Sequence, residues 1–176
     1  MVLGAPTARS IPDGMERAEA EAIAADVFRE VGDVCARAGT RLALEPNDAA
    51  YGTNFLVTVA EAAAFIRQVD HPAVTLNFDL GTVRMNGQDG MAGALLGEVA
   101  DVTSHVHLSE AHLAPVGPAL GAATTAMARQ AVLAGYDGWY SIEMRAVPGD
   151  PLRAVTAAVQ SSARALAAAL TFGGGR

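Results

Sequence analysis

The residues Val74-Thr-Leu-Asn-Phe-Asp79 form a short apolar run that ends on an acidic side chain. Three other runs also end on a side chain that can bind a metal ion. They are Arg41-Leu-Ala-Leu-Glu45, Thr103-Ser-His-Val-His107 and Gly138-Trp-Tyr-Ser-Ile-Glu143. Helix-patterned sequence separates consecutive runs, and strands that alternate with helices predict right-handed βαβ crossovers and a parallel sheet.

Composition indicates one globular domain over residues 1–176. The chain is 51% hydrophobic, which is too apolar for disorder. Its net charge of −7 and scattered basic residues argue against nucleic acid as a partner and favour a small polar ligand. All twelve basic residues are arginine, so no lysine is present to form a Schiff base with a carbonyl substrate.

Cysteine usage and hydropathy bear on the cellular location. The single cysteine, Cys35, lies in a predicted helix and allows no internal disulfide. No apolar stretch approaches the length of a membrane span, and the first residues do not resemble a signal peptide. We therefore expect a cytoplasmic protein without a membrane partner.

Periodic apolar residues predict helices between the strands. The first helix is expected over residues 15–38, with an amphipathic stripe at spacings of three and four made of Ile23, Val27, Val31, Val34 and Cys35. Thr58 and Glu61 have the spacing of a capping box for the second helix. A glycine-rich loop is expected after Asp79, followed by a short helix near residues 91–99. The last helix begins at Asp150-Pro151, and its predicted stripe contains Val155, Val159, Leu166 and Leu170.

Side-chain alternation separates two fold classes that have a parallel sheet. Counting back by two from each strand end gives one face with many polar residues, whereas the other face is apolar. Both faces of a doubly wound sheet are mostly apolar, but the inner face of a barrel can become polar at its carboxyl mouth. We therefore predict part of a (β/α)₈ barrel. Such a barrel needs about 250 residues, and five strands are found, so we expect about three βα units to be absent.

The open edges of a partial barrel have a consequence for assembly. Uncovered parallel strands invite pairing with another chain. We therefore expect a homo-oligomer, or a partner chain that covers the open barrel edges.

The four strand-end residues Glu45, Asp79, His107 and Glu143 predict a divalent-cation site. Oxygen-rich ligation with one imidazole suits Mn²⁺ or Mg²⁺ best, although Zn²⁺ or Co²⁺ would also bind. A cation at this place can stabilise the enediolate that forms when a proton leaves the carbon beside a carbonyl. Glu45 and Glu143 are the natural pair of carboxylates to act as base and acid.

Further residues near the strand ends are candidates for binding substrate. His105 lies on the same face as His107, and Glu110 and Arg145 follow their strands directly. Asn47 and Tyr51 lie in the loop after Glu45. Arg9 follows the first strand and can bind an anionic group. Each has a structural alternative: His105 as a hydrogen-bonded barrel residue, Asn47 as a turn former and Arg9 as an exposed loop residue.

Five motifs in the chain resemble the sugar phosphate isomerase/epimerase family, the xylose isomerase-like barrels. They are Val2-Leu-Gly-Ala-Pro6 with Arg9, Leu44-Glu-Pro-Asn47 with Tyr51-Gly-Thr-Asn-Phe55, Asn77-Phe-Asp-Leu-Gly81, His105-Val-His-Leu-Ser-Glu110 and Tyr136-Asp-Gly-Trp-Tyr-Ser-Ile-Glu-Met144. The resemblance spans nearly the whole chain and implies strands 4–8 of the barrel with their helices. It also implies that Glu45, Asp79, His107 and Glu143 match the metal ligands of the ketose 3-epimerase branch, where the two glutamates move the proton.

The chain departs from that family at two positions. Thr82 stands where many members have a histidine three residues after the aspartate. Leu113 stands where the epimerase branch has an arginine six residues after the ligand histidine. These differences leave the substrate open.

The predicted function is a metal-dependent isomerase or epimerase of a small sugar or keto-polyol. One alternative is a lyase or dehydratase that acts on a keto-inositol through the same enediolate. The AP endonuclease branch of this barrel is disfavoured by the four histidines and the negative net charge. A non-catalytic half-barrel that serves as a binding or scaffold subunit is the alternative from a different class.

Overall fold

The computed structural model describes residues 1–117 and 121–171. Its strands are β1 (Val2–Leu3), β2 (Leu42–Leu44), β3 (Val74–Asp79), β4 (Thr103–Ser109) and β5 (Trp139–Glu143). They form one sheet in the order β1-β2-β3-β4-β5, with parallel pairing. Each strand is followed by at least one helix. This is the alternation of a (β/α)₈ barrel, so the predicted fold class is confirmed as a partial barrel of five strands.

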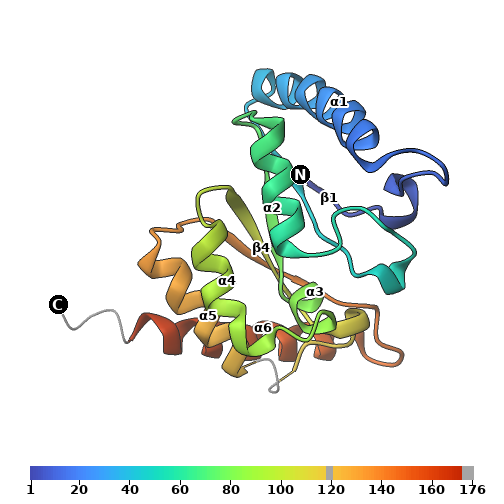
Figure 1. The fold of residues 1–176 in the computed structure, drawn as a ribbon. Helices are drawn as coiled ribbons and strands as arrows, with labels where there is room; N and C mark the ends of the chain where they lie inside the picture. Colours follow the sequence, from blue (N-terminus) through green and yellow to red (C-terminus); the bar gives the residue numbers. More distant parts are fainter. Residues whose placement is uncertain (118–120, 172–176) are drawn as a thin grey trace. The chain divides into compact units, whose positions relative to one another are not determined.

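The helices predicted above are found in the predicted order (Figure 1). They are α1 (Arg17–Arg37), α2 (Val59–Val69), α3 (Leu80–Met85), α4 (Ala92–Val99), α5 (Gly121–Leu133) and α6 (Pro151–Leu170). The expected loop after Asp79 is wrong, because α3 begins there. Asp79 caps that helix by accepting a hydrogen bond from the Thr82 amide at 2.6 Å. None of the helices in the described ranges is long and apolar enough to cross a bilayer.

The chain divides into two compact units. The first contains residues 1–78 and 102–104, and the second contains residues 79–101 and 105 onward. In the first unit α1 packs beside α2, and in the second α5 packs against both α4 and α6. Residues of the first unit's core include Leu44, Val59, Phe65 and Leu76, and those of the second include Leu96, Leu108 and Met127.

The first helix presents to the core a face that shares Cys35 with the predicted stripe but otherwise differs from it. Ile23, Val27 and Val34 are 52%, 52% and 56% exposed, whereas Ala25, Gly32 and Cys35 are buried. Small residues let α1 lie close to its neighbours, and the larger side chains remain outside.

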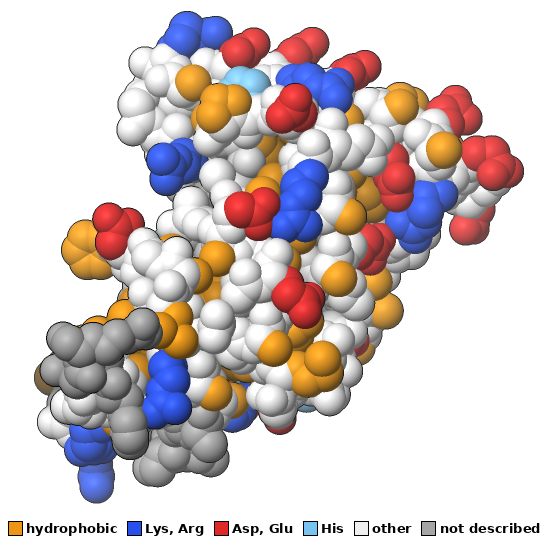
Figure 2. Space-filling view, turned by 60° about the vertical axis from the view of Figure 1, so that its left-hand side comes forward, with side chains coloured by type: hydrophobic (Ala, Val, Ile, Leu, Met, Phe, Trp, Pro, Cys, Tyr) orange, Lys and Arg blue, Asp and Glu red, His pale blue; other side chains and the backbone are white. Residues whose placement is uncertain are grey.

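The last helix shows the same pattern. It buries Ala158, Ser162, Ala165 and Ala169. Val155, Val159 and Leu170 of the predicted stripe are exposed, as is Leu152. Figure 2 shows exposed apolar side chains among charged ones on one face of the molecule.

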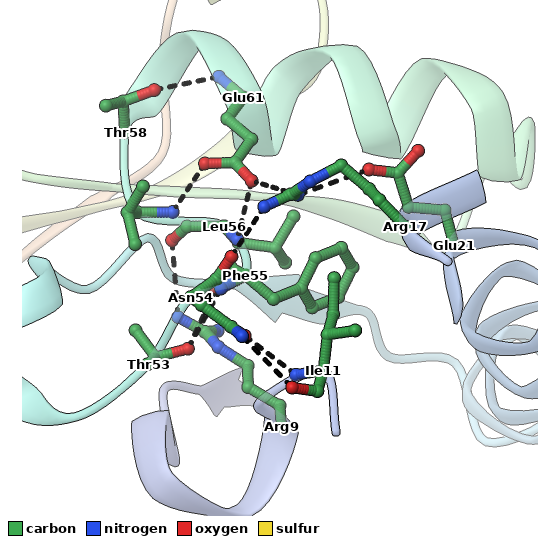
Figure 3. Close-up of polar contacts among 11 residues, drawn as sticks. Arg9, Ile11, Arg17, Glu21, Thr53, Asn54, Phe55, Leu56, Thr58 and Glu61 are labelled. Atoms are coloured by element: carbon green, nitrogen blue, oxygen red, sulfur yellow. Dashed lines mark hydrogen bonds and ion pairs between the residues drawn. The ribbon is translucent and has the colours of Figure 1, made fainter. Parts of the chain in front are cut away.

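The cap of α2 differs in part from the predicted box (Figure 3). Thr58 accepts a hydrogen bond from the Glu61 amide at 3.1 Å, as expected. The Glu61 carboxylate accepts instead from the amides of Leu56 and Val57, at 3.2 and 2.9 Å. These bonds stabilise Leu56 at a φ of 56°, which is unfavourable for a branched apolar residue. The loop that follows Glu45 is therefore fastened to the start of α2.

Candidate metal centre

Asp79, His107 and Glu143 lie together at the carboxyl ends of β3, β4 and β5 in the second unit. The His107 Nδ1 atom is 3.2 Å from Glu143 Oε2 and 3.8 Å from Asp79 Oδ2. Their candidate ligand atoms all lie within 4.8 Å of one another. The β4–β5 register pairs His107 with Ser141 and Ser109 with Glu143, so the imidazole and the glutamate project from the same face of neighbouring strands, two residues apart in register.

These separations fit ligands of one divalent ion. Two ligand atoms that each lie about 2.1 Å from one ion, with a ligand–ion–ligand angle of about 90–120°, are about 3.0–3.6 Å apart. The two measured separations lie in or close to this range. Two carboxylates and one imidazole form a mixed oxygen and nitrogen set that suits a divalent metal without thiolate ligands. The residues present therefore fit a divalent cation.

Hydrogen bonds fix the Asp79 carboxylate within the second unit. The Ser109 hydroxyl donates to Asp79 Oδ2 at 2.6 Å and accepts from the Gly81 amide at 2.8 Å. The other oxygen, Oδ1, accepts from the Thr82 amide. Sequence reasoning missed Ser109, although its position two residues after His107 placed it on the same face of the strand.

Glu45 follows β2 in the first unit and is 7% exposed. Its Oε1 accepts a hydrogen bond from Asn77 Nδ2 at 2.7 Å, and its Oε2 accepts one from Asn47 Nδ2 at 3.1 Å. The two amides hold the carboxylate from β3 and from the loop after β2. Asn77 lies two residues before Asp79 on the same face of the strand, but sequence reasoning gave it no role.

Arg9 is half-buried and lies against the same loop. Its Nη2 atom donates to Asn47 Oδ1 at 2.9 Å and more weakly to the Leu56 carbonyl at 3.5 Å. Figure 3 shows the guanidinium reaching toward this loop. Burial lowers the pKa of Arg9 to about 10, and the negative charges of Glu45 and Glu61 oppose that shift. The alternative of an exposed loop arginine is wrong.

Asn54 fastens the loop before α1 to the loop after β2. Its side chain accepts from the Ile11 amide at 2.7 Å and donates to the Ile11 carbonyl at 3.0 Å. Tyr51 ends a short 3₁₀ turn, Ala49–Tyr51, and is partly buried. The structure does not test the predicted contact of Tyr51 with substrate.

Glu110 and Arg145, predicted to bind substrate, have protein partners in the second unit. The Glu110 carboxylate forms an ion pair with Arg84, which also pairs with Asp89 at 3.2 Å. The guanidinium of Arg145 donates to the His112 carbonyl at 2.7 Å. Both residues therefore have a structural role in the positions observed, and their contact with substrate remains a prediction.

The ring of His105 lies against that of His107. The two ring centroids are 5.2 Å apart, with an interplanar angle of 82°. His105 is partly buried and has other partners in the protein. This arrangement agrees with a barrel residue one level below the candidate ligands, and the substrate role predicted for His105 is untested.

The model of the xylose isomerase-like TIM barrel family matches residues 2–168. The chain belongs to this family. The predicted family resemblance is thus confirmed. A comparison with curated protein sequences finds no match.

Solved structures of similar fold include two sugar epimerases and an AP endonuclease. The 3-keto-D-glucoside 4-epimerase of E. coli is 23% identical, with a TM-score of 0.69 over 97% of this chain and 63% of its own. An L-ribulose 3-epimerase is 19% identical, with a TM-score of 0.78 over 93% and 59%. An AP endonuclease of family 2 from Brucella melitensis is 22% identical, with a TM-score of 0.63 over 88% and 58%. The chain therefore spans about three fifths of these structures, and the likeness shows the fold.

Proposed function

We propose that this chain carries the metal site and proton-transfer residues of an isomerase or epimerase that acts on a small sugar or keto-polyol. The observation that carries the proposal is the convergence of Asp79, His107 and Glu143 on distances suited to one divalent cation. Epimerases of sugars among the structures of similar fold support the substrate class.

Glu45 is proposed as the fourth ligand. Its hydrogen bond with Asn77 supports this assignment, because Asn77 precedes Asp79 by two residues on the same strand. Residues two apart on a strand point to the same face. The β2–β3 register, which pairs Leu44 with Leu76, agrees with this placement. Mn²⁺ or Mg²⁺ is the proposed ion, on the basis of the ligand types.

In the proposed reaction, one glutamate removes a proton from the carbon beside the substrate carbonyl, and the other returns a proton on the opposite side. A bound divalent cation would stabilise the negative charge that develops on the substrate oxygens. The amides of Asn47 and Asn77 stabilise ionised Glu45, which suits a base. The side chain of Glu143 is 40% exposed, which gives its carboxylate access to exchange protons with solvent.

Metal binding is the first test. We expect the purified chain to bind Mn²⁺ in equilibrium dialysis followed by mass spectrometry. Glu143→Gln should lower the affinity at least about tenfold, since loss of even an indirect partner of a ligand costs 10–100-fold. Glu98→Gln, the same change at an exposed position of the second unit, is the matched control and should have no effect. A wild-type chain that binds no Mn²⁺ would refute the metal-dependent proposal.

Proton exchange tests the reaction class. Keto sugars incubated with the Mn²⁺-loaded chain in deuterated water should gain deuterium beside the carbonyl, as followed by NMR. Glu143→Gln should abolish this exchange. Exchange followed by loss of water would favour the lyase on a keto-inositol. Metal binding without exchange of any substrate proton would favour the non-catalytic half-barrel.

Assembly is part of the proposal, since the sheet edge at β5 and the outer faces of α1 and α6 expose apolar side chains. Helix α1 carries five acidic and three basic residues, whereas α6 carries two arginines and no acid. Opposite charge beside apolar stripes favours contact between α6 of one copy and α1 of another. We propose a homo-oligomer on this basis, with a separate partner chain as the alternative. The cytoplasmic location remains a prediction.

A further inference from the structure

The hydrogen bonds around Glu45 form a connected chain within the first unit. Asn77 and Asn47 each donate to a different oxygen of the Glu45 carboxylate, at 2.7 and 3.1 Å. Asn77 is fully buried and belongs to the neighbouring strand. Two donors on two segments restrict rotation of the carboxylate about its last side-chain bond.

Arg9 determines which way the Asn47 amide faces. The guanidinium has donors only, so the atom that it meets at 2.9 Å must be the amide oxygen. The amide nitrogen of Asn47 then faces Glu45. The Asn47 backbone adds a hydrogen bond to the Leu56 carbonyl at 3.0 Å, which ties this residue to the loop closed by Glu61.

The buried donors of Arg9 argue against a role in binding an anionic substrate. Its Nε and Nη1 atoms are inaccessible to solvent and have no hydrogen-bond partner among the described residues. Its Nη2 atom donates to the side-chain oxygen of Asn47 and to the Leu56 carbonyl. An anionic group would need exposed guanidinium donors, and the Nε and Nη1 atoms of Arg9 are buried.

A glycine completes the arrangement. A Cβ atom at Gly4 would lie 2.7 Å from Glu45 Oε2 and 3.3 Å from Asn47 Oδ1. The first contact is closer than real Cβ atoms tolerate, so any larger residue at this position would displace the carboxylate or the amide. The backbone directly after β1 thus lies against Glu45 and Asn47.

We propose that Arg9, Asn47 and Asn77, packed against Gly4, form a clamp that presents the Glu45 carboxylate in one orientation for metal binding. The inference rests on the proposed function and deepens it. It assigns Asn47 and Arg9 as positioning residues, in place of the substrate-binding roles predicted from the sequence, and gives Asn77 a role that the sequence did not reveal.

Charge-neutral substitutions test the clamp without altering the electrostatic attraction of the site for a cation. Asn77→Leu and Asn47→Ala each remove one amide donor to Glu45. Asn54→Ala is the matched control, because it also removes side-chain hydrogen bonds from the first unit but none to Glu45. Mn²⁺ affinity is measured by EPR in the absence of any substrate.

We expect Asn77→Leu and Asn47→Ala to weaken Mn²⁺ binding by about 10–100-fold and Asn54→Ala to leave it unchanged. A substrate-binding role for Asn47 would leave the affinity for the metal alone unaffected, and that result would overturn its assignment. If Asn77→Leu fails to fold, Asn47→Ala tests the same carboxylate from the loop. Equal losses in all three variants would indicate general loosening and would also overturn the clamp.

Crystal structures of the metal-free wild type and of Asn47→Ala separate the clamp from the proposed function. The clamp predicts that the Glu45 carboxylate turns away from its wild-type orientation in the variant. An unchanged orientation contradicts it, even if the wild type binds metal. If the wild type binds no Mn²⁺, the metal proposal fails, and the Glu45 orientation alone decides the clamp.

Discussion

Ser109 connects two neighbouring strand ends through a single hydroxyl. It is fully buried, donates to Asp79 and accepts from the Gly81 amide. Loss of the hydroxyl leaves a buried carboxylate oxygen and a buried amide each short of a partner. Such groups are costly because water cannot replace the missing bond.

We expect Ser109→Ala to lower the free energy of unfolding by about 1–3 kcal/mol, as measured by urea denaturation. Thr156→Ala provides the control, because that hydroxyl donates to the Leu152 carbonyl on an exposed helix face. Its loss should change stability by less than about 0.5 kcal/mol. Equal losses in the free energy of unfolding for the two substitutions would show that the buried Ser109 hydrogen bonds contribute no more than an exposed one.

A second prediction for a single residue concerns Gly4. Gly4→Ala should lower Mn²⁺ affinity at least about tenfold, because the new methyl group would push against the Glu45 carboxylate. Gly90→Ala serves as the comparison, since a Cβ at Gly90 meets nothing within 4 Å. EPR titration of both variants checks this expectation. Tight Mn²⁺ binding by Gly4→Ala would show that the carboxylate can move without loss.

At the scale of elements, β5 and the turn before it contain a pair of half-buried phenols, Tyr136 and Tyr140. Tyr136 and Tyr140 meet edge to face, with ring centroids 5.4 Å apart, and the Tyr136 hydroxyl donates to the Trp139 carbonyl at 2.8 Å. Burial raises the pKa of both phenols above the ordinary value of 10.0. The folded chain therefore holds these protons more tightly than the unfolded chain.

This difference predicts a loss of stability in alkali. The contribution of the tyrosines is complete below pH 10, and it is lost as the pH rises above 10 and the unfolded chain ionises. Urea denaturation from about pH 8 to about pH 11 should show a flatter decline for Tyr140→Phe than for the wild type. Comparing the two separates the phenol from other groups that titrate in this range. Parallel declines would refute the burial effect.

The two long helices show how element packing can reverse a sequence pattern. The predicted stripes consist of large apolar residues, but the buried faces of α1 and α6 consist of small ones. Trp139 gives a further case, since this large apolar side chain at the start of β5 is 81% exposed. Periodicity identifies an amphipathic helix, but it does not tell which of two apolar faces meets the rest of the chain.

For the molecule as a whole, the exposed apolar faces predict association. We expect analytical ultracentrifugation to detect oligomers, and Leu152→Gln with Val159→Gln to shift the chain toward the monomer. Loss of apolar contact area is the physical reason. Ala157→Gln, also on the exposed side of α6, is the control and should have a smaller effect. A wild-type chain that sediments as a monomer at every concentration would contradict the proposed homo-oligomer.

The sequence by itself determined the strand order, the parallel sheet and the candidate ligands Asp79, His107 and Glu143. It could do so because strand alternation and parallel pairing place residues at strand ends by simple counting. The same counting put Glu45 and Asn77 on one face.

Only the tertiary structure decided how these side chains are held. Glu45 accepts hydrogen bonds from Asn77 and from Asn47, whose amide is in turn held by the distant Arg9. The helix that Asp79 caps replaces an expected loop. The tertiary structure also determines that Glu110 forms an ion pair with Arg84. Hydrogen bonds and ion pairs depend on contacts between distant segments, and no local pattern encodes those contacts.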